Sequence, residues 1–302
     1  MVERITNITN KQNLPHSVDS RPVNIEPIPK GNLERSPQTD NVSLSGKKPM
    51  SESKALLTLG GIAAAMIGVA FAAKCRSSQI TKALDEIESR FLKLQENLPQ
   101  VQKTFKEVFL RDDITEKEAL EILNRYKEVE KIGVTGTKEE YMQAMFREAK
   151  NNYGLSSLPS ELNIVDKPIR GDERILGNTN PVGEVYIRST IEHGSIADTI
   201  HHELRHLKQR LFAFNLAPDE YVMHNQPRNM NIPKEVFEYA FGGEASVANI
   251  PPKYFDFAKK SCKAVISYCS VNKNEAGYLA QWVEQDAYNA GRQMAKLLNG
   301  NL

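Results

Sequence analysis

The spacing of hydrophobic residues predicts helices in the region that follows the N-terminal part of the chain. Two series recur at three- and four-residue intervals, which places each series on one face of an amphipathic helix. A Thr followed three residues later by a Glu marks helix starts at Thr115 and Thr137, because hydroxyl and carboxylate can bond the free amides of the first turn. We expect breaks near Pro99 and across residues 133–136, and a helical stalk or subdomain over residues 77–154. The two series are Ile80, Leu84, Ile87, Phe91 and Leu94, and Leu120, Leu123, Tyr126 and Val129.

Alternation of hydrophobic and more polar residues marks one β region, within residues 162–190. Val185 and Ile187 alternate with their neighbours after an Asn-Thr-Asn-Pro turn. This pattern predicts a short, half-exposed strand over residues 185–188.

Helical spacing returns after this strand. Ser195 with Asp198 forms another capping-box pattern and predicts the start of a helix. The pattern therefore predicts a mainly α domain with a small β-sheet, an α+β fold, over residues 155–302. The expected helices span residues 195–211, 254–270 and 276–298.

A run of nineteen residues from Ala55 to Ala73 has no charge and, Thr58 apart, no strong polar group. As a helix it would be about 28 Å long, close to the hydrocarbon thickness of a bilayer. The run begins too far into the chain for a secretory signal peptide. We predict a single transmembrane helix over residues 55–73. The alternative is an Ala- and Gly-rich helix in the core of a soluble protein.

Residues around and within this run bear on orientation and self-association. Four Lys or Arg residues lie within twenty residues before it and five within twenty residues after it. The crowding of Lys74 and Arg76 at the boundary favours a cytoplasmic C-terminal domain on a single-pass membrane protein. Gly60, Ala64 and Gly68 recur every four residues, which would let two such helices approach closely and self-associate.

The composition of residues 1–54 differs from that of the rest of the chain. This segment holds six of the fifteen prolines and no Phe, Tyr or Trp. Such a segment buries too little apolar surface to offset the entropy of ordering it, so we predict a disordered tail rather than a small polar domain.

The charge balance and the cysteine count exclude two classes of protein. Lys and Arg number 39 against 38 Asp and Glu, a balance that offers no positive field to hold a nucleic acid. The three cysteines form no even framework, and Cys262 and Cys269 would lie about 10 Å apart along one helix, too far for a disulfide. A disulfide scaffold is therefore excluded.

The histidines carry the specific chemistry of the chain. Four of the six lie within fourteen residues, and two of these four are His202 and His206. Residues that lie four apart on a helix share one face, so this pair can present two imidazole nitrogens to one Zn²⁺ ion. Glu203, about 100° around the helix, can reach a water on the metal as a general base. The motif is His-Glu-x-x-His.

A third metal ligand is expected on the last predicted helix. There, Glu284 lies in a stripe of otherwise small residues, where an ordinary amphipathic helix would bury Leu or Val. A glutamate buried without a cation would cost several kcal/mol, which favours a metal partner over a solvated side chain. The small residues of the stripe are Gly277, Ala280, Ala287 and Gly291. Competitors for the third position are Glu235, Glu238 and Glu244.

These two motifs resemble those of the gluzincin zinc metallopeptidases, most closely the membrane-associated CAAX-protease and HtpX-like branch, where a Glu-x-x-Ala element follows the zinc helix. In this chain the second motif reads Glu-Gln-Asp-Ala from Glu284. The resemblance covers residues 185–291 and implies a zincin-like fold. It implies Zn²⁺ held by His202, His206 and Glu284. It also implies Glu203 as the general base.

Two residues depart from the family pattern. Arg205 is charged where the motif usually has a small or apolar residue, and Tyr288 stands where an Asp commonly follows the Ala. A cation at Arg205 would oppose Zn²⁺ unless it extends away or pairs with a carboxylate. The metzincin variant is excluded, because Gln209 and Phe212 occupy its Gly and third His positions.

Three further residues are candidates for supporting roles. Tyr288 could donate a hydrogen bond to a ligand, stabilise an oxyanion or simply pack as an aromatic residue. His224, in a polar segment beyond the zinc helix, is a weaker oxyanion candidate. His201 is expected beside the ligands or at the surface, rather than as a ligand.

The sequence therefore favours a membrane-anchored, zinc-dependent peptidase that hydrolyses protein or peptide substrate with a metal-activated water. We expect the substrate to lie beside the strand over residues 185–188 by β-augmentation. The alternative is a catalytically inactive, membrane-tethered zincin-like interaction protein, which Arg205 and the missing Asp favour.

Overall fold

The computed structural model describes residues 77–226, 231–267 and 275–301. Two predictions lie outside these ranges: the tail over residues 1–54 and the membrane span over residues 55–73, which includes Gly60, Ala64 and Gly68. Within the described ranges, no helix combines the length and the apolar character needed to cross a membrane. All described residues belong to one compact unit.

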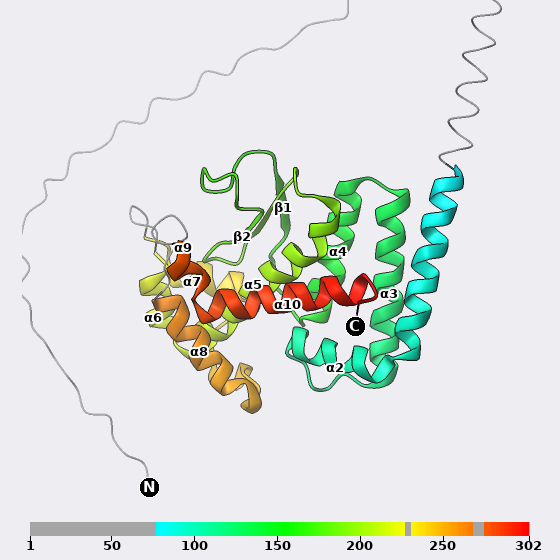
Figure 1. Cartoon of the computed structure of the whole chain (residues 1–302). Helices are drawn as coiled ribbons and strands as arrows, with labels where there is room; N and C mark the ends of the chain where they lie inside the picture. The colour runs from blue at the N-terminus through cyan, green and yellow to red at the C-terminus, as the bar shows by residue number, and fades with distance from the viewer. Residues whose placement is uncertain (1–76, 227–230, 268–274, 302) are drawn as a thin grey trace, which may run out of the picture. The chain divides into compact units, whose positions relative to one another are not determined.

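The described chain begins with four consecutive helices, drawn in cyan to green in Figure 1. The first break falls where it was predicted, because Pro99 occupies the first turn of the second helix and cannot continue the first. The third helix ends at Gly136, which is also the predicted break. The helices span residues 77–96, Leu98–Phe109 (α2), Glu116–Thr135 (α3) and Lys138–Asn152 (α4).

The two predicted capping boxes differ in the structure. At Thr137 the box is complete, since the hydroxyl accepts from the Glu140 amide and the Glu140 carboxylate accepts from the Thr137 amide. At Thr115 the box is half formed. Its hydroxyl accepts from the Glu118 amide, but the Glu118 carboxylate pairs with Arg111 at 2.8 Å.

Three short strands form one sheet in the described chain, which confirms a mainly α fold with a small β-sheet. The strand order is β1-β3-β2, with β1 parallel and β2 antiparallel to β3. The strand predicted over residues 185–188 is present at the centre of the sheet. Its alternation holds for Val185 and Ile187, which are fully buried, and for Tyr186, which is half-buried. It fails at Arg188, which is buried although the pattern places it with the exposed residues. The strands span Leu162–Val165 (β1), Gly177–Thr179 (β2) and Val185–Arg188 (β3).

The helix with the His-Glu-x-x-His motif, α5 (Ile196–Leu216), is the centre of the domain. It contacts the sheet, α4, α8 and α10. The predicted capping box at its start is wrong. Ser195 is the N-cap residue, but it ends a short 3₁₀ turn (His193–Ser195, η1), and its side chain makes no capping hydrogen bond. The helix also extends past the predicted end, because residues such as Phe212 and Phe214 are buried.

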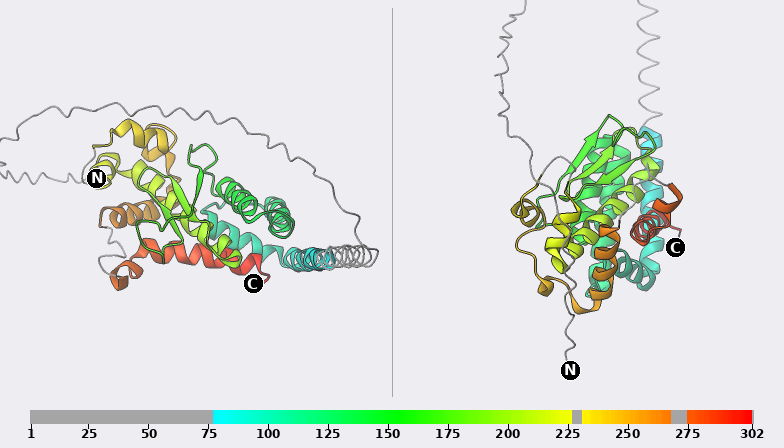
Figure 2. Two further views of the ribbon diagram at one scale, coloured as in Figure 1. Left: turned by 90° about the horizontal axis from the view of Figure 1, so that it is seen from above. Right: turned by 90° about the vertical axis from the view of Figure 1, so that its left-hand side faces the viewer.

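The C-terminal part wraps around α5 and ends in α10, which runs beside it (Figures 1 and 2). The prediction of one helix over residues 276–298 is wrong, because the chain turns at Ala280 and Gln281. Gly277 and Ala280 therefore do not share the helix of Glu284. The elements are Pro218–His224 (α6), Lys234–Ala240 (α7), Val247–Asn249 (η2), Pro252–Tyr254 (η3), Phe255–Ile266 (α8), Glu275–Leu279 (α9) and Trp282–Leu298 (α10).

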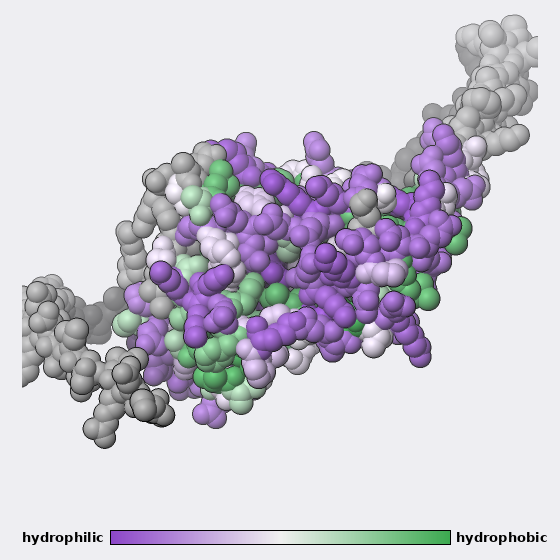
Figure 3. All heavy atoms as spheres, turned by 60° about the horizontal axis from the view of Figure 1, so that its bottom comes forward, coloured by the Kyte–Doolittle hydropathy of each residue, from purple (hydrophilic) through white to green (hydrophobic). Residues whose placement is uncertain are grey.

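One hydrophobic core joins the early helices to the region around the motif. Its buried members run from Ile87 in the first helix to Leu298 in α10, through Phe105, Tyr126 and Leu204. Hydrophilic side chains predominate on the face shown in Figure 3, as expected outside such a core. Side chains from the early helices and from α10 therefore pack in the same core as those of α5.

Candidate metal centre

His202 and His206 lie one turn apart on α5 and turn their rings toward the same point. Their Nε2 atoms are 3.0 Å apart, and the two rings meet edge to face with centroids 4.6 Å apart. Both side chains are about nine-tenths buried. The four-residue spacing accounts for this convergence, because it returns a helical residue to the same face.

Glu284 reaches the same point from α10. Its Oε2 lies 3.6 Å from His202 Nε2 and 3.3 Å from His206 Nε2, and the residue is fully buried. One ligand atom from each of the three residues lies within 4.8 Å of the others. Among the described residues, this is the one group of three such side chains that could hold a metal ion.

The close approach of α10 to α5 depends on Gly291. A Cβ atom at this position would come within 2.5 Å of the carbonyl oxygen of Asp198 on α5. Ala287, one turn earlier on α10, is also fully buried. These two members of the predicted stripe share the helix of Glu284. They allow the short interhelical distance that carries the Glu284 carboxylate to the histidines.

Glu284 and His206 shift each other's pKa values. Burial by itself raises the pKa of Glu284. His206 and His202 together lower it by more than burial raises it, so the pKa of this carboxyl lies well below its usual range. For His206, burial lowers the pKa, while the charge of Glu284 raises it by more, to about 8. Glu284 is therefore an ionised carboxylate, the form that binds a metal.

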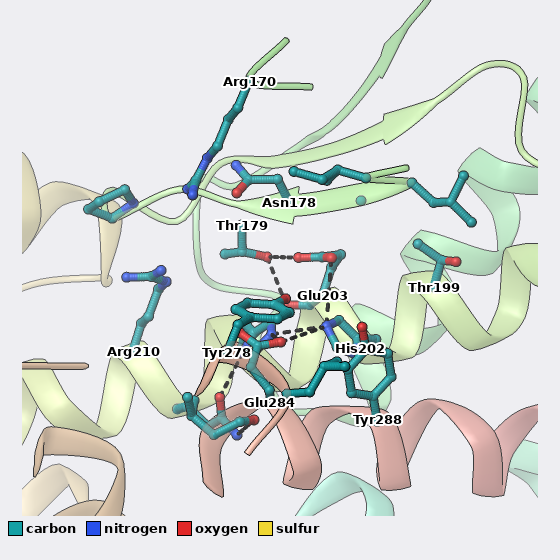
Figure 4. Close-up of a pocket in the computed structure, with 18 of the residues that line it drawn as sticks. Arg170, Asn178, Thr179, Thr199, His202, Glu203, Arg210, Tyr278, Glu284 and Tyr288 are labelled. Atoms are coloured by element: carbon teal, nitrogen blue, oxygen red, sulfur yellow. Dashed lines mark hydrogen bonds and ion pairs between the residues drawn. The ribbon is translucent and has the colours of Figure 1, made fainter. Parts of the chain in front are cut away.

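Glu203 lies next to the three ligands without joining them. Its Oε1 is 4.0 Å from His202 Nε2. Thr179 of β2 lies 2.9 Å from both Oε2 and the backbone oxygen of Glu203, so its hydroxyl can donate to either (Figure 4). The carboxylate of Glu203 is held between β2 and the ligands, where it can accept a proton from a water in the cavity.

A chain of polar contacts supports His206 from behind. Gln209 Oε1 lies 2.9 Å from His206 Nδ1, and Gln209 Nε2 donates to Asp286 at 2.8 Å. Asp286 in turn accepts two hydrogen bonds from Arg205. The Arg205 side chain thus pairs with a carboxylate and lies over the ring of Phe257, with its charge compensated. This is the exception stated for Arg205 in the sequence analysis, a cation that pairs with a carboxylate.

The three supporting candidates have different positions. Tyr288 lines the cavity and packs against His202, with ring centroids 4.5 Å apart. His224, at the end of α6, also lines the cavity. His201 is not one of the three ligands, as predicted, but its expected place beside the ligands or at the surface is wrong: it is fully buried on another face of α5, where its Nε2 lies 3.2 Å from Tyr126 Oη. Consecutive residues differ by about 100° around a helix, so His201 and His202 cannot share a face.

The competing carboxylates lie elsewhere. Glu235, Glu238 and Glu244 are not among the residues that line the cavity, and none belongs to the metal-binding group. Glu235 and Glu244 are exposed. Of the acidic residues considered, Glu284 is the one that the structure places with the histidines.

A cavity of about 560 Å³ opens over the metal-binding group. Its walls include β2, the exposed segment before it, α5 and the α9–α10 turn. Three residues with chemical roles in or behind this wall were not predicted: Thr179, Gln209 and Asp286. Gln209 follows His206 by three residues and Asp286 follows Glu284 by two, so helical spacing could have identified both. Strand β2 is too short to show alternation, so no pattern identified Thr179.

No family model matches this chain, and neither a curated protein nor a solved structure does.

Proposed function

We propose that this protein is a zinc-dependent peptidase with a zincin-like catalytic domain. One observation carries the proposal: His202, His206 and Glu284 converge from two helices. Beside them, Glu203 faces the same cavity. Catalytic zinc sites have three protein ligands and leave the fourth coordination position to a water, with a carboxylate within reach of that water. Structural zinc sites instead have four protein ligands. The resemblance to gluzincin motifs agrees with this arrangement.

The distances between the donor atoms support zinc. In a tetrahedral site with bonds of about 2.0–2.2 Å, neighbouring nitrogen and oxygen ligands lie about 3.3–3.6 Å apart. The two distances from Glu284 Oε2 to the histidine nitrogens, 3.6 and 3.3 Å, lie in this range, and the distance of 3.0 Å between the two nitrogens is slightly shorter. Two imidazoles and one carboxylate are also a donor set that zinc accepts.

The residues around the ligands have separate tasks in peptide hydrolysis. When bound, Zn²⁺ supplies an acidified water and polarises the carbonyl of the substrate. Glu203 accepts the proton of the attacking water at its carboxylate and delivers it to the leaving amine. Thr179 holds one oxygen of that carboxylate. Gln209 fixes the ring of His206, whose Nε2 faces His202 and Glu284 and would be one of the atoms that hold the metal.

Substrate binds along β2 rather than β3 in this proposal. Strand β3 has a neighbour on each side, so the expected β-augmentation beside residues 185–188 is not available. The backbone groups of Leu176 and Asn180 bond to residues of the β3 segment. Along an antiparallel strand, residues that bond to one neighbour alternate with residues whose backbone groups face the other way. The backbone groups of Gly177 and Thr179 therefore face the outer edge of the sheet, where an extended peptide can pair.

The proposal includes a single membrane anchor formed by residues 55–73, with the catalytic domain on the cytoplasmic side and contacts between anchors through their small residues. Resistance of the full chain to carbonate extraction would support the anchor. Complete release into the soluble fraction would contradict it.

The inactive-scaffold alternative loses one of its two supports. It was favoured by the charge of Arg205 and by the missing Asp, and the charge of Arg205 is paired with Asp286 at 2.6 Å and 2.8 Å. Tyr288 still stands where the Asp would be. His202, His206, Glu284 and Glu203 line one cavity, which supports an enzyme over a scaffold.

Zinc content and cleavage of the full chain test the proposal. Purified wild-type protein should hold one zinc per chain, Glu284→Ala should lose it, and Glu203→Gln should retain it. Of these three proteins, only the wild type should cleave a mixture of quenched fluorescent peptides. Absence of stoichiometric zinc in the wild type, or unchanged cleavage by Glu203→Gln, would refute the proposal.

A further inference from the structure

The two histidines of the candidate metal centre differ in the contacts of their Nδ1 atoms. His206 Nδ1 lies 2.9 Å from Gln209 Oε1. The amide nitrogen of Gln209 donates elsewhere, to Val283 and Asp286. Its oxygen is therefore the atom that accepts from His206. His202 Nδ1, by contrast, is buried and has no hydrogen-bond partner among the described residues.

The role of a metal ligand places a proton on His202 Nδ1. For both Nε2 atoms to bind one metal, both must be unprotonated, so each neutral ring keeps its proton on Nδ1. A ligand histidine almost always donates this proton to a carboxylate, a carbonyl oxygen or a water, which fixes the ring and makes it more basic. His202 therefore needs an acceptor beside its Nδ1, as His206 has in Gln209.

Asp198 is a carboxylate on the same face of α5. It lies four residues before His202, a spacing that puts the two Cβ atoms about 5–6 Å apart. Each carboxylate oxygen and His202 Nδ1 lie two bonds beyond their Cβ atoms. Helical side chains also lean toward the N-terminus of the helix, which carries the His202 ring over the turn of Asp198. The helix itself therefore brings this carboxylate within reach of Nδ1.

The Asp198 carboxylate points into the contact between α5 and α10. A Cβ atom at Gly291 of α10 would clash with its Oδ1. Asp198 and His202 both line the cavity, and the His202 ring contacts α10 through Tyr288. Within the described part of the chain, the Asp198 side chain forms no hydrogen bond or ion pair. The exposed Arg292 instead lies over the ring of Tyr288.

Two neutral hydroxyls are the alternatives for this role. Thr199 lies three residues before His202, but its methyl group faces Gly177 of β2. Figure 4 shows Thr199 reaching toward the strand, while Tyr288 lies directly beside His202. That contact is between the two rings, with centroids 4.5 Å apart. A carboxylate accepts a stronger hydrogen bond than a hydroxyl does, which favours Asp198.

We infer that Asp198 is the positioning residue of His202: its carboxylate accepts a hydrogen bond from His202 Nδ1 and keeps Nε2 directed at the other two ligands. The inference rests on the proposed zinc peptidase function and adds a residue to that site. Each ligand histidine then has its own partner on α5. Gln209 follows His206 by three residues, and Asp198 precedes His202 by four.

Zinc affinity of the full chain tests this assignment without turnover. In competition with a chromogenic chelator for Zn²⁺, Asp198→Ala should bind about tenfold to a hundredfold more weakly than the wild type. Asp198→Asn keeps an acceptor oxygen and should retain more affinity. Glu192→Gln is the control, because it removes an exposed carboxylate just before α5 and should change the affinity by less than about twofold. Urea unfolding with excess chelator verifies that each variant folds.

Nuclear magnetic resonance of the histidine rings tests the hydrogen bond itself. Zinc-loaded full-chain protein with ¹⁵N-labelled histidine should show two Nδ1 protons from the ligands. The proton shared with a carboxylate should lie at lower field than the one that faces the Gln209 amide. Asp198→Ala should shift or remove the first signal and leave the second. Thr199→Val and Tyr288→Phe, which remove the alternative hydroxyls, should leave both.

The outcomes separate this role from the peptidase function. Zinc affinity of Asp198→Ala within about twofold of the wild type would overturn the assignment, even if the wild type cleaves peptides. An equal loss in Asp198→Asn would also overturn it, because charge alone would then explain the effect. Loss of the low-field signal in Thr199→Val or Tyr288→Phe would give the role to that hydroxyl. Weak zinc binding by Asp198→Ala, in a protein whose wild type binds zinc but cleaves nothing, would retain the role and reject the peptidase.

Discussion

Arg205 and Asp286 form a buried ion pair between the two helices that supply the metal ligands. Arg205 Nε and Nη2 donate to the two carboxylate oxygens at 2.6 and 2.8 Å. Arg205 Nη1 also donates to the backbone oxygen of Val108 at 2.7 Å, at the end of α2. Each partner lies within three residues of a metal ligand, so the pair joins α5, α10 and α2 directly behind the candidate metal centre.

Removing one partner of this pair should destabilise the protein strongly. Arg205→Met or Asp286→Asn leaves a charge or its acceptors buried without compensation, at a cost of about 3–5 kcal/mol. The double variant Arg205→Met/Asp286→Leu should recover part of this loss. As a control, Lys82→Met breaks an exposed pair with Glu86 and should cost less than about 0.5 kcal/mol. Free energies of unfolding in urea check these values, and equal losses for Arg205→Met and Lys82→Met would contradict the role of the buried pair.

Gln209 should tune metal affinity. Gln209→Leu removes the acceptor beside His206 Nδ1 and the donor to Asp286. Loss of such a partner behind a ligand weakens metal binding by about tenfold to a hundredfold. Gln209→Glu keeps the acceptor and should retain more affinity. Competition with a chromogenic chelator measures both, and wild-type affinity in Gln209→Leu would show that the His206 ring is held by other contacts.

Gly177 should be required for the proposed activity but not for metal binding. A Cβ atom at this position would lie 2.7 Å from Glu203 Oε1 and 2.8 Å from its Cγ, so Gly177→Ala must displace the proposed general base. We expect a loss of cleavage of about a hundredfold or more, with one zinc still bound. Gly194→Ala is the matched control, because nothing lies within 4 Å of its added methyl group. Similar rates for the two variants would contradict this steric explanation.

His201 should make the protein sensitive to acid. Burial lowers its pKa to about 3, whereas the unfolded chain has the ordinary value of about 6.5. Between these values the unfolded state binds a proton that the folded state does not. The contribution of His201 to stability is therefore full above pH 6.5 and is lost as the pH falls toward 3, by about 1.4 kcal/mol per pH unit.

Comparison with His201→Phe isolates this contribution. The phenyl ring can pack among the aromatic side chains of Phe109, Tyr126 and Tyr153 and cannot be protonated. In urea unfolding between pH 4 and 8, with a chelator present, the wild type should lose stability faster than the variant below about pH 6.5. Parallel curves would mean that His201 is protonated in the folded state.

Local spacing accounts for the parts of the structure that were predicted. The amphipathic early helices, the breaks at Pro99 and Gly136 and the strand over residues 185–188 all follow from residues close in sequence. The one-face geometry of His202 and His206 has the same origin. By contrast, the burial of Arg188 goes with a hydrogen bond to the backbone oxygen of Glu173 that β-alternation does not reveal, and the break before α10 depends on a turn without Gly or Pro.

The sequence by itself determined which side chains can share a helical face, because the rise and rotation per residue are properties of the backbone. It thereby identified the histidine pair, its glutamate and a later glutamate in a small-residue stripe. Only the tertiary structure decided that Arg205 pairs with Asp286, that Thr179 holds Glu203 and that His201 is a core residue. Those contacts join segments that are tens of residues apart. Packing sets them through interhelical distances such as the one that Gly291 allows, and such distances are not encoded in local spacing.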